Sequence, residues 1–241
     1  MNMETLFTPT QDQVKQYQRL RAVSRELNQK ILKTVPKRAF EEIGTAIGIL
    51  RDGILVLDSE SMTSVMSDCL LYDWYQGDKN IMQRYFESHP PQPGSDEDLL
   101  LHAYLEAEYT VLRVMSAVPD AGVHCDDLLI GGEIFVMDIS MSNSGFVNYA
   151  AATRVVPMGD YWVTGGALLP IDREVPLEEA FKKIGGDNLD RPEGPSGISI
   201  PIIRACLAAG AADHVRYEEK FVYPGKPQRR GHLPPKLPRR R

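Results

Sequence analysis

The hydrophobic pattern of the chain changes near Pro119, and this change constrains the fold more than any other feature of the sequence. Before Pro119, apolar residues recur every three or four positions, which is typical of amphipathic helices. From Gly122 to Pro170 they form short runs separated by Gly, Asp or Asn, which indicates strands joined by turns. The sequence therefore predicts an α+β protein, in which a helical N-terminal region is followed by a small curved β-sheet or barrel-like domain.

The first helix is predicted to begin after Thr10, a good N-cap residue, and to end near Thr34. An apolar stripe runs along it and is expected to face a partner surface: Val14, Tyr17, Leu20, Val23, Leu27 and Ile31. Further helices are predicted over residues 37–50, 59–74, 79–88 and 97–116. About four strands follow, and Gly131-Gly132 is expected to form a hairpin turn because glycine accepts positive φ without steric cost.

The predicted domain boundaries follow from these changes of pattern. Residues 1–117 form the helical domain and residues 118–172 the small β-domain. Residues 173–220 contain a loop and a C-terminal helix that packs on the body, with a further short helix expected over residues 177–184. Residues 221–241 are basic and rich in proline, and they are predicted to be disordered because such a run cannot bury a core.

Two stretches resemble a poorly characterised bacterial family. These are DGILVLDSESMTSVMSDCLLYDWYQGDKNIMQRYFE, and DDLLIGGEIFVMDISMSNSG followed by ATRVVPMGDYWVTGGALLP. The resemblance implies a helical N-terminal region before a small β-domain that is built around a D-L-L-x-G-E hairpin. Similar β-domains occur beside Cys-rich zinc tails of the SEC-C type, but here no Cys follows Cys206, so that zinc module is absent. The resemblance implies a fold outline and no activity.

The cysteines and the ligand-type residues do not form a metal-binding pattern. Cys69, Cys125 and Cys206 are widely spaced in apolar surroundings, which indicates buried free thiols in a reducing cytoplasm. His124-Cys125-Asp126-Asp127 is expected to lie on a strand with the polar residues outward and Cys125 inward, because strand neighbours point to opposite faces. No metal or other cofactor is predicted. The N-terminus does not have the pattern of a signal peptide, and no run is long enough to span a membrane.

Arg84 and His89 form the one pattern that suggests catalysis. Their Arg-x-x-x-x-His spacing in a helical region resembles the catalytic pattern of HEPN ribonucleases, in which the two residues act on an RNA phosphate and the 2′-hydroxyl. The resemblance covers two residues, and Tyr85 departs from the polar residue that this family tends to have. Alternatively, Arg84 is a solvated helix residue and His89 lies favourably near a helix C-terminus.

The last sixteen residues contain seven Lys or Arg and no Asp or Glu, although the whole chain has a net charge of −6. The rest of the chain therefore has a net charge of −13. Three interpretations of this tail remain open: an arm that neutralises phosphates, a polyproline-II ligand with a basic anchor, or a solvated extension resting on the acidic body. The cationic residues are Lys226, Arg229, Arg230, Lys236, Arg239, Arg240 and Arg241.

These observations predict a non-enzymatic cytoplasmic binding or adaptor protein whose tail contacts a polyanion, such as nucleic acid or a ribosomal surface. The first alternative is a metal-independent ribonuclease that uses Arg84 and His89. The second is a protein-interaction module, in which the β-domain or the Leu20 to Ile31 stripe docks a partner protein. No membrane association is predicted, and the sequence leaves the oligomeric state open.

Overall fold

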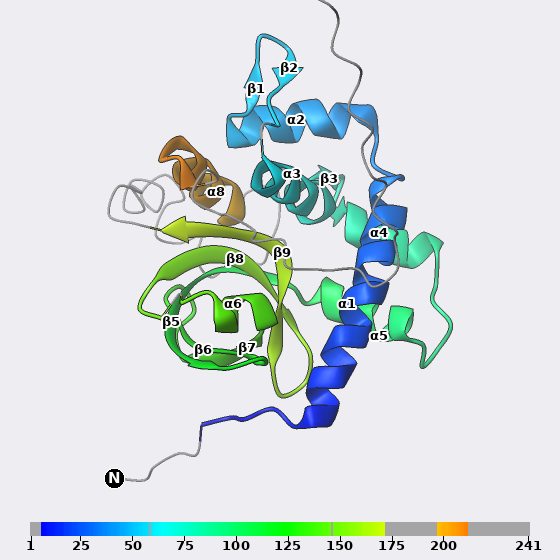
Figure 1. Ribbon diagram of the computed structural model, residues 1–241. Helices are drawn as coiled ribbons and strands as arrows, with labels where there is room; N and C mark the ends of the chain where they lie inside the picture. The colour runs from blue at the N-terminus through cyan, green and yellow to red at the C-terminus, as the bar shows by residue number, and fades with distance from the viewer. Residues whose placement is uncertain (1–5, 58, 146, 172–196, 212–241) are drawn as a thin grey trace, which may run out of the picture.

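The computed structural model describes residues 6–57, 59–145, 147–171 and 197–211 (Figure 1). Its centre is a closed five-stranded barrel, which confirms the predicted α+β class and the small barrel. The strands are β5 (Glu108–Val118), β6 (Gly122–Asp127), β7 (Glu133–Met137), β8 (Ala150–Pro157) and β9 (Trp162–Ile171).

The barrel has the strand order β5-β6-β7-β9-β8 and closes when β8 pairs with β5. Its strands are antiparallel except for β7 and β9, which are parallel. A short helix, α6 (Ile139–Asn143), lies between β7 and β8. A five-stranded Greek-key barrel with its third and fifth strands parallel, and a helix after the third strand, has the connectivity of the OB fold.

The first barrel strand, β5, is long enough to pair along two different neighbours. Residues 108–113 pair with β8. Residues 112–118 pair with β6, and the register of this pairing shifts between Val114 and Ser116. A β-bulge of this kind bends a strand and increases its twist, which closes the small barrel. The prediction of one helix over residues 97–116 is therefore wrong in its second half. The helix ends at Leu105, and the first barrel strand lies before the predicted domain boundary at 118.

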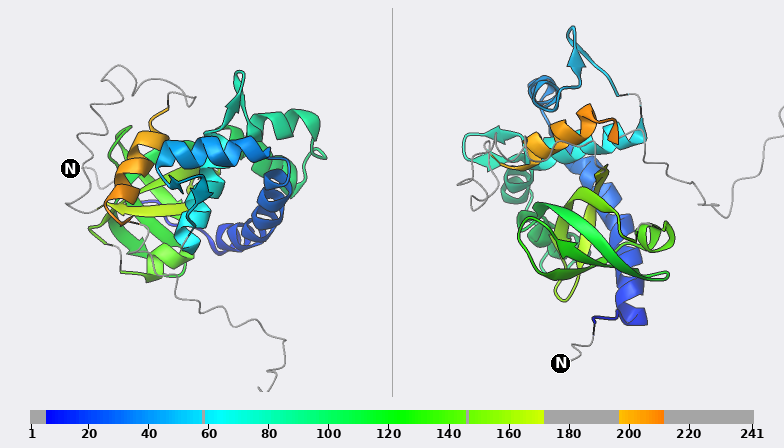
Figure 2. Two further views of the ribbon diagram at one scale, coloured as in Figure 1. Left: turned by 90° about the horizontal axis from the view of Figure 1, so that it is seen from above. Right: turned by 90° about the vertical axis from the view of Figure 1, so that its left-hand side faces the viewer.

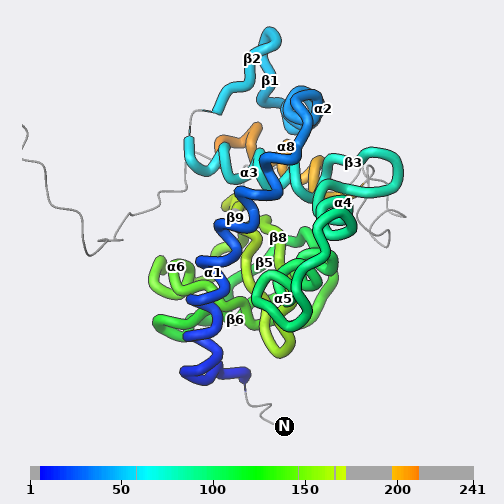
Figure 3. The backbone as a smooth tube through the Cα atoms, turned by 90° about the vertical axis from the view of Figure 1, so that its right-hand side faces the viewer, coloured from blue at the N-terminus to red at the C-terminus, as the bar shows by residue number. Residues whose placement is uncertain are grey.

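A helical layer covers one side and one end of the barrel (Figures 1 and 2). Helix α1 runs along the side of the barrel beside α5, whereas α3 and α8 contact β9 (Figure 3). The helices are α1 (Gln11–Leu32), α2 (Lys37–Ile47), α3 (Glu60–Tyr72), α4 (Ile81–Ser88), α5 (Asp96–Leu105) and α8 (Ser199–Ala208). Two small hairpins lie between helices, β1 (Leu50–Arg51) with β2 (Ile54–Leu55) and β3 (Tyr75–Gln76) with β4 (Lys79–Asn80).

Helix α1 begins where the sequence predicts. The Thr10 hydroxyl accepts a hydrogen bond from the Gln13 backbone N–H, and the Gln13 side chain accepts one from the Thr10 N–H. This reciprocal capping box satisfies two donors that a helix start leaves without intrahelical partners. The apolar stripe of α1 faces a surface within the chain, so it does not offer the docking site that the second alternative supposed. Leu20, Leu27 and Ile31 are buried in the chain's own core, because the barrel and the other helices cover that side of the helix.

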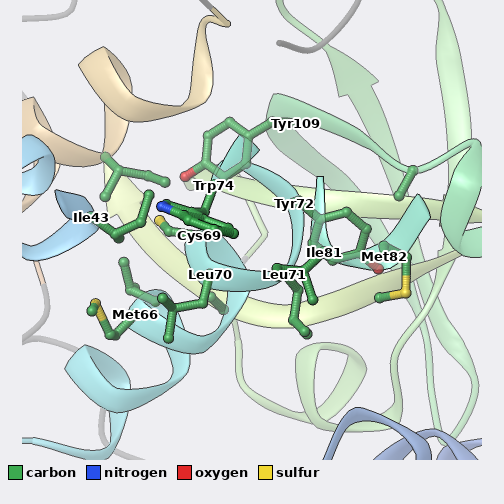
Figure 4. Packing of buried hydrophobic residues seen from close by; sticks show 14 of the residues in the cluster. Ile43, Met66, Cys69, Leu70, Leu71, Tyr72, Trp74, Ile81, Met82 and Tyr109 are labelled. Carbon is green, nitrogen blue, oxygen red and sulfur yellow. The ribbon is translucent and has the colours of Figure 1, made fainter. Parts of the chain in front are cut away.

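The main core joins the helical layer to the barrel. It contains apolar residues of α1, α2, α3, α5 and α8 together with Tyr109 and Val111 of β5 and Leu169 of β9. Figure 4 shows Tyr109 beside Cys69, Trp74 and the apolar face of α3. A second cluster fills the barrel interior and includes Cys125. The helices and the barrel therefore stabilise each other through shared buried apolar surface.

The C-terminal helix and the glycine turn agree with the sequence analysis. Helix α8 packs on α2 and β9, as expected for a helix near residues 200–212 that packs on the body. Gly131 and Gly132 form the β6–β7 turn with φ values of 86° and 96°, which favour glycine. The expected helix at 177–184 and the basic tail lie outside the described residues.

Candidate binding site

The N-terminal segment, residues 6–10, packs through Phe7 against the outward side of β6 and β7. We call this side the β6–β7 face; its outward side chains are His124, Asp126, Glu133, Phe135 and Met137. In Figure 1 the segment runs below the barrel, on the side of these two strands, before it enters α1. The Phe7 ring lies 5.1 Å from the Phe135 ring, centroid to centroid, at an interplanar angle of 51°. The His124 ring lies 4.9 Å from Phe135 in an edge-to-face arrangement. Such tilted contacts are favourable for aromatic rings.

The cover over the β6–β7 face continues from the segment into α1. Tyr17 of α1, Ala121 of the β5–β6 loop and Tyr161 of the β8–β9 loop form one buried cluster with Phe135 and Met137. Gly122 permits this close packing, because a Cβ atom there would lie 2.2 Å from the Val136 carbonyl oxygen. The N-terminal segment, the first turns of α1 and two barrel loops therefore meet over the same two strands.

Burial shifts the pKa of two groups in this cover. Desolvation lowers the pKa of His124, although the nearby Glu133 carboxylate and a hydrogen bond to the backbone of Phe7 act in the opposite direction. Burial also raises the pKa of Tyr17 to about 12, and the charge of Asp138 adds to that rise. Desolvation therefore disfavours the charged form of His124, whose ring contacts both Phe135 and the N-terminal segment.

A small cavity of about 20 Å³ lies beside this cluster, between α1, α5 and strands β8 and β9. Arg21 is one of its walls and donates a hydrogen bond to the Thr164 carbonyl oxygen at 3.3 Å. The Tyr104 hydroxyl, on another wall, donates to Ser24 Oγ at 2.6 Å. The cavity is large enough for a single water molecule.

The most deeply buried charges of the described residues lie elsewhere, where α3, β8 and α8 meet. The Arg154 side chain is 0% exposed, and its guanidinium donates to Asp68 at 3.0 Å and to Asp73 at 2.9 Å. Asp73 also accepts a hydrogen bond from the Ser199 hydroxyl at 2.6 Å. The guanidinium carbon lies 4.4 Å from the Tyr72 ring centroid. This buried ion cluster ties two helices to the barrel.

The chemistry of the buried ion cluster fits a structural role. Burial raises the pKa of Asp68 to about 6; Arg154 opposes this rise, whereas Asp73 adds to it. Burial also raises the pKa of the neighbouring Cys69 thiol well above its ordinary value. A protonated thiol is a poor nucleophile, so the cluster holds Cys69 in an unreactive state.

Arg84 and His89 lie at the exposed surface of α4 and its C-terminal end. The Arg84 guanidinium donates to Gln76 Oε1 at 2.6 Å, whereas the His89 ring stacks on Tyr85 with centroids 4.4 Å apart. His89 Nδ1 lies 2.9 Å from Ser88 Oγ. Each of the two side chains therefore contacts a different neighbour.

The strand at residues 124–127 agrees with the prediction in part. His124 and Asp126 point outward, and Cys125 is 0% exposed inside the barrel, where burial raises its pKa to about 12. Asp127, in contrast, is buried and accepts hydrogen bonds from the Thr110 hydroxyl and from two backbone N–H groups of the β6–β7 turn. It points inward because it is two positions after Cys125 on the same strand, and these donors satisfy its buried carboxylate.

The three cysteines are buried and none of them forms a disulfide bond, as predicted. Among the residues that the structure describes, no group of three or more His, Cys, Asp or Glu side chains could hold a metal ion. Within the same residues, no helix has the length and apolar character needed to cross a bilayer. The seven cationic tail residues lie outside the described ranges.

The fold and the site together define an α+β protein whose OB-type barrel has a covered β6–β7 face. The chain belongs to a family of unknown function, DUF7986, whose profile matches residues 11–184. This match confirms the predicted membership of a poorly characterised family, whereas the association with SEC-C zinc tails stays a prediction. No curated protein and no solved structure gives a significant match to the chain.

Sequence reasoning missed both sets of contacts that define these sites. Arg154 lies within the run ATRVV, where its flanking apolar residues were the one signal that it enters the core. Phe7 is a large apolar residue three positions before the helix cap, and its hydrophobicity was the one signal that it packs against the fold. Neither signal identifies a partner, because the partners are more than eighty residues away in the sequence.

Proposed function

We propose that this protein is a non-enzymatic cytoplasmic binding or adaptor protein whose basic C-terminal tail contacts a polyanion, such as nucleic acid or a ribosomal surface. The observation that carries the proposal is the separation of charge along the chain. The last sixteen residues have a net charge of +7 and the rest has −13. An acidic body repels a polyanion, so attraction is confined to the tail and binding takes one orientation.

The barrel supports a binding role by analogy of fold. OB-type barrels bind oligonucleotides and oligosaccharides on the face of their second and third strands, although a fold alone does not define a function. In this chain that face is covered by the N-terminal segment and carries Asp126 and Glu133. The polyanion is therefore assigned to the tail and not to the barrel.

The ribonuclease that would use Arg84 and His89 remains an untested alternative. No contact among the described residues favours it over the adaptor function, since Arg84 binds Gln76 and His89 stacks on Tyr85.

The test is the salt dependence of binding to duplex DNA and to single-stranded RNA, measured by fluorescence anisotropy after nuclease treatment of the purified protein. Seven cations give a slope of log affinity against log salt of up to about −6 on duplex DNA. The full chain is compared with a variant that ends at Gly225. A second variant, in which the seven Lys and Arg of the tail become Gln, keeps the length and proline content.

Both variants are expected to lose most of the slope, because the phosphate contacts come from these cations. Equal binding by the full chain and both variants would show that the tail is not the contact. Loss of binding in the truncated variant alone would assign it to the proline-rich backbone instead.

A further inference from the structure

The N-terminal segment is seated on the part of the barrel where proteins of this connectivity bind their ligands. The cluster around Phe135 contains residues of the second and third strands, Ala121 of the first loop and Tyr161 of the loop between the fourth and fifth strands. Strands two and three and these two loops form the ligand surface of OB-type barrels. The segment therefore occupies a binding position, although it belongs to the same chain.

The contact depends on one aromatic side chain and on the backbone. Phe7 is partly buried against Phe135 and its backbone hydrogen-bonds His124. The neighbouring Leu6 side chain, in contrast, is 58% exposed. Residues 6–10 have no helix or strand assignment and lie before the α1 cap. A short peptide with a single aromatic anchor is thus bound at the part of the face formed by Phe135 and His124.

We propose that the β6–β7 face is a docking site for an extended peptide of a partner protein with an aromatic anchor, and that the N-terminal segment fills this site in cis. This inference goes beyond the polyanion function and does not depend on it. The seated segment shows the chemistry of the occupant: a phenylalanine or similar ring between Phe135 and the barrel loops, and a backbone group within reach of His124.

The charges near the face favour a peptide over a nucleic acid. Asp126 and Glu133 lie side by side on it, and Asp160 is exposed in the β8–β9 loop. Arg113 forms an ion pair with Asp126, so it offsets part of this negative charge. Phosphates are repelled by such a surface, whereas a neutral or basic peptide is not. The partner segment is therefore expected to carry no acidic residue next to its anchor.

Because the N-terminal segment occupies the site, a partner peptide can bind only when this segment leaves it. A segment tethered by a short linker has an effective concentration in the millimolar range, so a free peptide of equal intrinsic affinity competes poorly. The face becomes available when the segment is displaced by a better ligand or removed. Truncation of residues 1–7 removes Phe7 but keeps Thr10 and Gln13, which cap α1.

The experiment titrates a synthetic peptide with the sequence of residues 5–11, blocked at both ends, into the full chain and into the variant that lacks residues 1–7. Binding is followed by chemical-shift changes of isotope-labelled protein. The truncated variant is expected to bind at least about tenfold more tightly than the full chain, because the tethered competitor is gone. The shifted amides should belong to β6, β7 and the two loops.

Two peptide variants provide matched controls at adjacent positions. Replacing the phenylalanine by alanine is expected to weaken binding by about tenfold or more, since the anchor is lost. Replacing the leucine by alanine should change it by less than about twofold, because the Leu6 side chain is largely exposed. In the truncated protein, His124→Ala should also weaken binding.

The proposal is overturned if the truncated protein binds no more tightly than the full chain, or if both peptide variants bind equally well. If a ten-nucleotide oligo(dT) shifts the same β6 and β7 amides and binds more tightly than the peptide to a truncated protein that also ends at Gly225, the face belongs to nucleic acid and the proposal is overturned too. If circular dichroism shows that the truncated variant does not fold, the full chain with Phe7→Ala is tested in its place. The same tenfold gain is expected there, because the aromatic competitor is lost while the segment stays.

Discussion

Replacing Arg154 by methionine tests whether the buried ion cluster holds the helical layer on the barrel. The Met side chain has similar length and no charge, so Asp68 and Asp73 lose their shared cation while the volume is nearly kept. Removing one partner of a buried ion pair costs about 3–5 kcal/mol, because the remaining charge is left uncompensated. The Arg154 cation–π contact to Tyr72, at 4.4 Å, is lost as well.

The expected loss of stability is therefore about 4 kcal/mol, which lowers the melting temperature by about 8–16 °C for a protein of this size. The loss should be larger at about pH 7.5 than at about pH 5.5, because the unpaired carboxyl groups take up protons as the pH falls and no longer bear a buried charge. Urea unfolding followed by circular dichroism at the two pH values measures both effects.

Arg113→Met is the matched control. Arg113 is also a strand arginine paired with an aspartate, but its side chain is 50% exposed, and exposed pairs contribute less than about 1 kcal/mol. A loss below about 1 kcal/mol in Arg154→Met, or one of equal size at both pH values, would contradict the reasoning. Adding Asp68→Asn and Asp73→Asn to Arg154→Met should restore part of the stability, since no buried charge then remains.

Three further predictions concern single groups. The effect of Asp68→Asn on the free energy of unfolding is expected to be more favourable at about pH 8 than at about pH 4, by at most about 3 kcal/mol. The reason is that the folded-state pKa of Asp68 is raised to about 6, so the wild-type protein loses stability as the pH rises through that value. Urea titrations at the two pH values measure this difference, and a more favourable effect at the lower pH would contradict the sign. The three buried cysteines should react slowly with an alkylating reagent in the native state and fast in denaturant, because burial keeps thiols such as Cys125 protonated and inaccessible; fast native labelling in a mass-spectrometric time course would refute it. Arg84→Ala and His89→Ala should each leave the melting temperature nearly unchanged, and the wild-type protein should not cleave RNA without metal; cleavage that either substitution abolishes would establish the ribonuclease alternative.

The sequence could predict the features that depend on neighbouring residues. Thr10 and Gln13 are three positions apart and form the capping box by themselves, so the start of α1 could be predicted. The turn at Gly131-Gly132 could be predicted because consecutive residues with positive φ are favourable for glycine. The burial of Cys125 followed from strand alternation around it.

The secondary structure of short apolar runs could not be predicted from the local sequence. Residues 97–116 fit a helical period, yet only α5 is helical and β5 begins at Glu108. Such runs are compatible with both structures, and barrel pairing with β6 and β8 decides between them. Asp127 was expected outward because it is polar, although strand alternation puts it on the same side as Cys125. Thr110 and the turn N–H groups supply the hydrogen bonds that make its burial possible.

By itself, the sequence determined the α+β class, the helix caps, the glycine turn and the separation of charge between body and tail, since each is set by residues close in the chain or by composition. The tertiary structure decided that Arg154 meets Asp68 and that Phe7 covers Phe135. These pairs are 86 and 128 positions apart. Their contact is set by barrel closure and helix packing, and no local pattern of polarity or propensity encodes which distant side chains will share a buried space.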